Sequence, residues 1–135
     1  MKKVQGLSLV EVLISMAILG VVIVAVASSM ATNLKVTSSS HEQNVALKYV
    51  DSALELYRIH WRSMSNYEST SNPNMEQINR MLGQGMTAVI EAPEGLDFDG
   101  NPTSAHNPPM RRITIMVLRG DKLLAKGSTV IGKPL

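Results

Sequence analysis

Residues 7–34, LSLVEVLISMAILGVVIVAVASSMATNL, form the longest apolar run in the chain and decide its fold. A helix needs about 20 apolar residues to span a bilayer, so residues 7–31 are long enough to cross one. Glu11 is the only charged side chain in the run. Placing a carboxylate at a bilayer centre raises the free energy of membrane insertion by roughly 2.5–3.5 kcal/mol. A membrane helix that retains a carboxylate therefore indicates a partner for the charge.

Besides Glu11, the polar side chains within residues 7–31 are the hydroxyls of Ser8, Ser15, Ser28 and Ser29. A membrane helix tolerates them, because a serine hydroxyl can bond back to the helix backbone. Gly20 weakens the helix by roughly 1 kcal/mol relative to alanine. The segment still predicts a transmembrane helix.

Length and composition exclude several classes of protein. The 135 residues suffice for one domain with a terminal segment, and the part outside the apolar run is large enough for one small core. Lys2 and Lys3 account for the net charge of +2, so composition gives no basic surface on the scale of a nucleic-acid-binding protein. The absence of cysteine excludes disulfide bonds and thiolate chemistry.

A second helical pattern begins at residue 42 and reads EQNVALKYVDSALELYRIHWR. Its apolar side chains recur at spacings of three and four, which place them on one face of a helix. Residues 32–41, TNLKVTSSSH, have poor helix propensity. We therefore expect a helix over residues 32–62 that continues the first helix across a soft joint near residues 36–40. The face expected to pack against the rest of the head consists of Leu47, Val50, Leu54, Tyr57 and Trp61.

Residues 63–135 carry the pattern of a small globular head. In chain order, its predicted parts are a loop (63–75), a short helical turn (76–82), a strand (86–92), a long connection (94–109) and two strands (111–120 and 122–132). The last two strands form a predicted hairpin, because Gly120 and Asp121 between them are turn residues. The predicted fold is α+β: a long N-terminal helix, half transmembrane and half amphipathic, packed against a small antiparallel sheet of about three strands.

The first 30 residues resemble the class III signal of type IV pilins and their pseudopilin relatives. The resemblance lies in the short basic start KKVQ at residues 2–5, the glycine after it, the glutamate at a fixed offset, and the apolar run of GLSLVEVLISMAILGVV. It implies that residues 1–6 are a leader, that prepilin peptidase cuts between Gly6 and Leu7, and that the new amine is methylated. It also implies that Glu11 of one subunit pairs with the N-terminal amine of a neighbour in a fibre.

By this resemblance the chain is a structural subunit of a type IV pilus-like fibre and not an enzyme. It would cross the inner membrane once, with the head outside the cytoplasm, and then enter a pilus or pseudopilus. Its expected partners are prepilin peptidase, other pilin or pseudopilin subunits, an inner-membrane assembly platform and membrane lipid. Nucleic acid would be a partner only in a competence pilus. Adhesive or motile pili, type II secretion and competence all remain open.

Two positions depart from the family pattern. Leu7 stands where phenylalanine usually follows the cut, and Ser28 stands where many major pilins carry a helix-kinking proline. The disulfide-closed loop of many major pilins is also absent, because the chain has no cysteine. The absence of that proline, together with the SLVEVLI wording at residues 8–14 and the small head, favours a minor pilin or a pseudopilin.

Two other readings of the N-terminus stay open. Ala25-Val26-Ala27 fits the A-x-A cleavage pattern of a secretory signal, which would release a soluble periplasmic domain after Ala27. Alternatively, Lys2 and Lys3 could hold an uncleaved anchor with its start in the cytoplasm.

A weak metal-binding pattern occurs in the connection before the hairpin. Asp97, Asp99 and Asn101 alternate as they do at the start of a calcium loop, but Pro102 and Pro108 stand where an EF-hand needs glycine and glutamate. We expect a solvated turn there, and neither a metal nor a cofactor in the protein.

Overall fold

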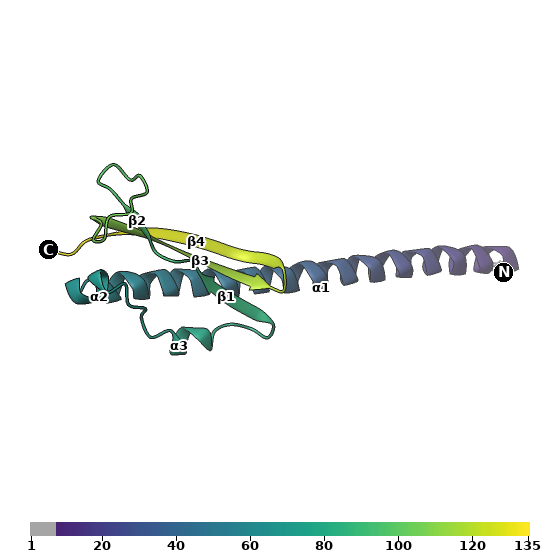
Figure 1. Ribbon diagram of the computed structural model, residues 1–135. Coiled ribbons are helices and arrows are strands. Elements are labelled where there is room, and N and C mark those ends of the chain that lie inside the picture. Colours follow the sequence, from purple (N-terminus) through teal and green to yellow (C-terminus); the bar gives the residue numbers. More distant parts are fainter. Residues whose placement is uncertain (1–7) are drawn as a thin grey trace. The chain divides into compact units, whose positions relative to one another are not determined.

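The computed structural model describes residues 8–135. Its elements are α1 (Leu9–His60), α2 (Met64–Glu68), α3 (Glu76–Asn79), β1 (Met86–Ile90), β2 (Glu94–Leu96), β3 (Met110–Arg119) and β4 (Lys122–Gly132). A long helix and a small antiparallel sheet confirm the predicted α+β fold (Figure 1). The chain divides into two units, the first ending at Ser39 and the second comprising Ser40–Leu135.

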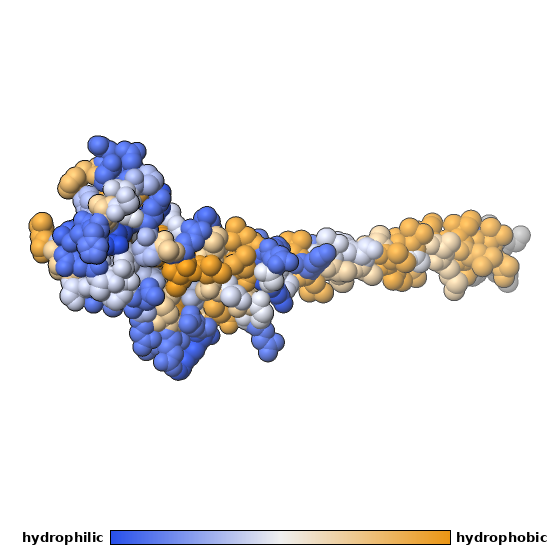
Figure 2. Space-filling model, in the orientation of Figure 1, coloured by the Kyte–Doolittle hydropathy of each residue, from blue (hydrophilic) through white to orange (hydrophobic). Residues whose placement is uncertain are grey.

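The first unit is the apolar part of α1. Every residue from Ser8 to Ser38 is exposed, and Figure 2 shows hydrophobic side chains along this part of the helix. The helix is long and apolar enough to cross a membrane. An apolar surface of this size is suited to lipid or to other helices.

α1 remains helical through residues 36–40, where the sequence predicted a soft joint, so the helix does not break there. Serine and threonine are only modestly poorer than alanine in a helix interior. Extending a helix that has already formed also avoids the unfavourable nucleation step. Five residues of modest helix propensity are therefore too few to end the helix.

In the second unit, β3 is the central strand of a four-stranded sheet. β4 pairs along one side of β3, while β1 and β2 pair with successive parts of its other side. The predicted hairpin is confirmed, with Gly120 at a φ of +57° in its turn. The fourth strand, β2, lies within the predicted connection 94–109, so the expected count of about three strands missed it.

The core of the second unit lies between α1 and the sheet. Figure 1 shows β3 and β4 running beside this part of α1. The buried residues of the helix and sheet include Ala46, Tyr49, Val50, Ala53, Leu54, Tyr57, Trp61, Ile113, Ile115, Val117 and Ala125. Four of the five side chains in the predicted packing face are therefore buried.

The fifth member of the predicted packing face, Leu47, is 48% exposed. The buried face is instead continued toward the N-terminus by Ala46 and Tyr49, both fully or almost fully buried. Leu47 and Ala46 lie three and four residues before Val50, so helical spacing alone allowed either residue on the buried face. The prediction chose Leu47 because its side chain is larger and more hydrophobic. The core encloses the smaller of the two, since Ala46 is fully buried in the hydrophobic cluster.

The segment after α1 folds back on the core through aromatic side chains. Trp61 packs edge-on against Tyr57 at 5.3 Å and against Tyr67 at 6.0 Å between ring centroids. The Tyr67 hydroxyl donates a hydrogen bond to the carbonyl of Pro108 at 3.1 Å. Tyr67 lies on α2, a helix within the stretch 63–75 that was predicted to be a loop.

Candidate functional site

The first turn of α1 is closed by two side chains, Ser8 and Glu11. The backbone N–H of Ser8 donates to Glu11 Oε2 at 2.8 Å, and the backbone N–H of Glu11 donates to Ser8 Oγ at 3.3 Å. The Ser8 carbonyl accepts the N–H of Val12 at 3.2 Å, as a residue just before a helix does. The two reciprocal bonds between Ser8 and Glu11 form a capping box.

The capping box matters because the first N–H groups of a helix have no partner within the helix. In an apolar environment without water, each unsatisfied group costs several kcal/mol. The arrangement satisfies the N–H groups of Ser8 and Glu11. It also places the Glu11 carboxyl at the end of the helix whose dipole favours a negative charge.

Ser8 was expected to bond backward to the helix backbone like the other serines of the segment, and this prediction is wrong. Ser15 does bond backward, since its hydroxyl donates to the Glu11 carbonyl at 2.7 Å. Ser8 instead accepts from the residue three positions ahead. The S-x-x-E spacing of Ser8 and Glu11 was the available signal for this cap.

The predicted processing residues, Gly6 and Leu7, lie outside the described residues. Glu11, the predicted assembly residue, is exposed on the surface of the apolar helix. The structure therefore shows how Glu11 is held within its own chain.

The surface of the second unit carries polar contacts that connect its elements. Glu42 on α1 pairs with Arg119 of β3, and the hydrogen bond from Arg119 holds the pKa of Glu42 below its usual value. Glu68 accepts a hydrogen bond from Asn107 at 2.9 Å and lies 3.5 Å from Lys133. These two neighbours likewise lower the pKa of Glu68. Both carboxylates join segments far apart in sequence.

Arg111 is a buried cation on β3. It is 8% exposed, and its Nε has no hydrogen-bond partner among residues 8–135. The guanidinium carbon lies 5.1 Å from the ring centroid of Tyr67, within the range of a cation–π contact. Arg111 thus extends the aromatic packing of the core.

The weak calcium candidate forms a closed turn. The Asp97 Oδ1 accepts the backbone N–H groups of Asp99 at 2.9 Å and of Asn101 at 2.8 Å. These backbone hydrogen bonds, that from Asn101 foremost, lower the pKa of Asp97. Within residues 8–135, no group of three or more carboxylate or histidine side chains is arranged to hold a metal ion. The carboxylate is thus engaged in shaping its own loop.

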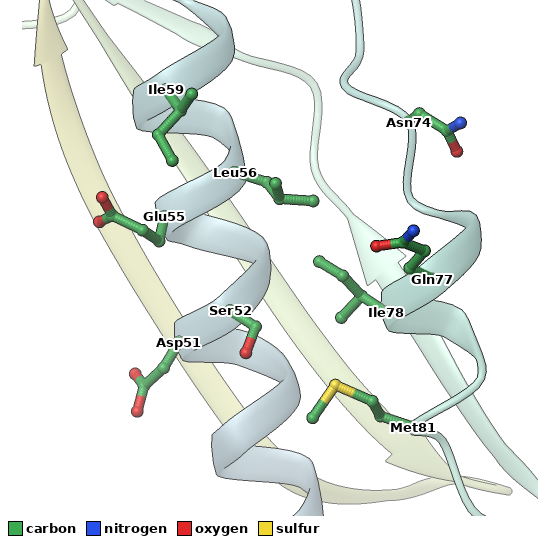
Figure 3. A pocket seen from close by; sticks show the side chains of 9 residues that line it. All are labelled: Asp51, Ser52, Glu55, Leu56, Ile59, Asn74, Gln77, Ile78 and Met81. Carbon is green, nitrogen blue, oxygen red and sulfur yellow. The ribbon is translucent and has the colours of Figure 1, made fainter.

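An open groove of about 750 Å³ lies between α1 and the segment around α3 (Figure 3). Its lining consists of Asp51, Ser52, Glu55, Leu56, Ile59, Asn74, Gln77, Ile78 and Met81. In Figure 3, Leu56 and Ile78 point toward each other across the groove, while Asp51 and Glu55 point away from α3. This lining mixes polar and apolar side chains, and it lacks a nucleophile paired with a histidine or lysine base.

Comparison with known proteins assigns the N-terminal segment to a class. Residues 1–27 match the family model described as the prokaryotic N-terminal methylation motif. No curated protein and no solved structure matches the chain. The match confirms a type IV pilin-like prepilin signal at the N-terminus. Together with the exposed apolar helix, it indicates a membrane-anchored, pilin-like structural subunit.

Proposed function

We propose that the protein is a subunit of a type IV pilus-like fibre, either a minor pilin or a pseudopilin. Prepilin peptidase cuts between Gly6 and Leu7, and the amine of Leu7 is then methylated. The subunit crosses the inner membrane once, keeps its head outside the cytoplasm, and is extracted into the fibre by an assembly platform. The observation that carries this proposal is the methylation motif leading directly into an exposed apolar helix.

Within the fibre, Glu11 pairs with the N-terminal amine of a neighbouring subunit. Support comes from its place as the only charged side chain between Leu7 and Leu34. A carboxylate among packed apolar helices needs an opposite charge, and removing one partner of a buried pair typically costs about 3–5 kcal/mol. A single pair at a fixed position therefore sets the axial register of one helix against the next.

The first experiment is intact mass spectrometry, with N-terminal fragmentation, of the protein from its native membrane fraction. We expect a chain that begins at Leu7 and carries one additional methyl group. A chain that begins at Ser28 would instead mean a soluble periplasmic domain released after Ala27, and a chain that keeps Met1 would mean a plain anchor. Either of these would refute the proposed function.

The second experiment separates charge from hydrogen bonding at Glu11. Glu11→Gln keeps an oxygen that can accept the Ser8 N–H, because glutamine also serves in capping boxes, but it cannot form an ion pair. We expect normal cleavage and at least a hundredfold lower share in sheared fibres, as a loss of about 3 kcal/mol implies. Ser15→Ala, one helical turn away, is the control and should assemble normally. Normal assembly of Glu11→Gln would contradict the pairing.

A further inference from the structure

We propose that Phe98 is an aromatic anchor of the head, which inserts into an apolar pocket of another protein whose rim carries a lysine or an arginine. Phe98 is the only phenylalanine in the chain, and it is 87% exposed. It lies in the connection between β2 and β3, which projects from the sheet in Figure 1. The inference goes beyond the role of a fibre subunit, because it gives the head a partner of its own.

The loop that carries Phe98 is held in place by the fold. The N–H of Asp97 donates to the carbonyl of Asn101 at 2.9 Å, which closes the turn around Phe98. Directly before this turn, Leu96 is almost fully buried and forms an isolated bridge with Pro102. Phe98 is therefore exposed on a closed turn that is attached to buried structure on one side.

A fixed aromatic side chain is well suited to bind in a pocket. Single exposed apolar side chains are common on protein surfaces and need no partner. An aromatic ring on a closed turn differs from these, because it has few rotatable bonds and loses little conformational entropy when it binds. Aromatic residues at the centre of protein interfaces also supply a large part of the binding free energy.

The charges around Phe98 indicate the chemistry of the partner. Residues 91–110 contain four carboxylates and no lysine or arginine. Glu91 and Glu94 pair with cations of the sheet. Asp97 and Asp99, on either side of Phe98, form no salt bridge with any residue in 8–135. These two carboxylates favour a pocket with a cationic rim, and they disfavour an anionic lipid surface, which attracts lysine and arginine.

Three pockets of the head lack this combination, which argues against a second copy of the chain as the partner. The groove between α1 and α3 is lined by Asp51 and Glu55 and by no cation. A pocket of about 410 Å³ beside β1 has an uncharged lining. In a pocket of about 400 Å³ near the start of the head, Arg119 is already paired with Glu42. A different protein is therefore the better fit to the acidic loop.

The test replaces Phe98 with the photoreactive residue p-benzoylphenylalanine in the full chain, produced in the native cell. Irradiation joins this side chain to a group that it contacts, and mass spectrometry identifies the bonded protein and residue. We expect one product, bonded at an apolar side chain beside a lysine or arginine of another protein. The same residue in place of His106, which is exposed in the same connection, is the control and should not give this product.

Four outcomes of this experiment would overturn the inference. The first is a product with lipid alone, and the second is a product with another copy of the chain. The third is no product at all. The fourth is an equal yield from the position of His106, because the contact would then follow from random collision with an exposed loop.

A second set of variants separates the ring from the charge. The photoreactive residue is placed at Asn101, on the same turn, so that Phe98 can be changed. Phe98→Ala should lower the yield of the same product about tenfold or more, and Asp99→Lys should lower it about threefold or more. Leu123→Ala removes a half-exposed apolar side chain of β4 and should leave the yield unchanged. An unchanged yield in Phe98→Ala, or an equal loss in Leu123→Ala, would show that Phe98 is not the anchor.

Discussion

Replacing Gly127 with alanine tests how closely β4 approaches α1. A Cβ atom at this position would lie 2.5 Å from Val50 Cγ1 and 3.2 Å from Leu54 Cδ1. Carbon atoms in favourable contact are about 3.5–4.0 Å apart, so strand and helix must separate by about 1 Å. Val50 is 2% exposed, so its side chain is enclosed by the core. Overpacking of this kind costs about 1–3 kcal/mol.

The free energy of unfolding can be measured by urea denaturation of the full chain in detergent micelles. Trp61 is the only tryptophan and is fully buried, so its fluorescence reports the head. Gly127→Ala should lower the free energy of unfolding by about 1–3 kcal/mol. Gly132→Ala, near the end of the same strand, has nothing within 4 Å of its added Cβ. This control should change stability by less than about 0.5 kcal/mol.

A double variant isolates the contact between Gly127 and Val50. Val50→Ala removes the atom nearest to the added methyl group, although it leaves a cavity with its own cost. In that background Gly127→Ala should be less harmful, with a coupling free energy of about 0.5–3 kcal/mol. The same cost in both backgrounds, or no cost in either, would refute the close packing of strand and helix.

Three further predictions concern the head. Tyr67→Phe should lower the free energy of unfolding in the same urea assay by about 1–3 kcal/mol, because the carbonyl of Pro108 loses a buried 3.1 Å hydrogen bond; an unchanged value would contradict this role. Arg111→Met should change stability by less than about 1.5 kcal/mol, because methionine fills much of the same space and removes a buried Nε that has no acceptor among residues 8–135; a larger loss would show that the guanidinium itself stabilises the core. Acid should destabilise the head, because hydrogen bonds hold the pKa of Glu42 and of Glu68 below the ordinary glutamate value in the folded state. Their contribution is complete above the unfolded pKa and is lost as the pH falls through the folded values, so melting temperatures measured from about pH 7 to about pH 3 should decrease.

The parts of the protein that depend on local sequence were predictable. The apolar helix follows from a long run of apolar side chains, and the methylation motif matches residues 1–27. The β3–β4 hairpin follows from Gly120 and Asp121 between two strand patterns. In each case, the residues that specify the structure are adjacent or nearly adjacent in the chain.

The missed features depend on partners far away in sequence. β2 has only three residues and becomes a strand through its pairing with β3. α2 occurs in a Ser- and Asn-rich stretch, where Tyr67 packs on Trp61 and bonds to Pro108. Neither β2 nor α2 could be predicted from the helix or strand propensities of its residues, because the contacts that stabilise each element come from elsewhere in the fold.

The capping bonds between Ser8 and Glu11 were missed in a different way. Glu11 was identified by its unfavourable position in an apolar run, and that argument considered only its charge. The role of Ser8 required attention to the unpaired N–H groups at the start of the helix. The spacing of the two residues already contained that information, so a count of backbone donors would have found the cap from the sequence.

The central position of β3 determines the order in which the head can be completed during synthesis. The face of α1 around Tyr49 and Tyr57 is translated well before β3, which joins all three other strands. Translation adds about 5–20 residues per second, and a domain generally folds as a unit. A nascent chain that pauses before residue 110 therefore displays its aromatic helix face without the strands that cover it. Such chains should be the species that chaperones and proteases encounter.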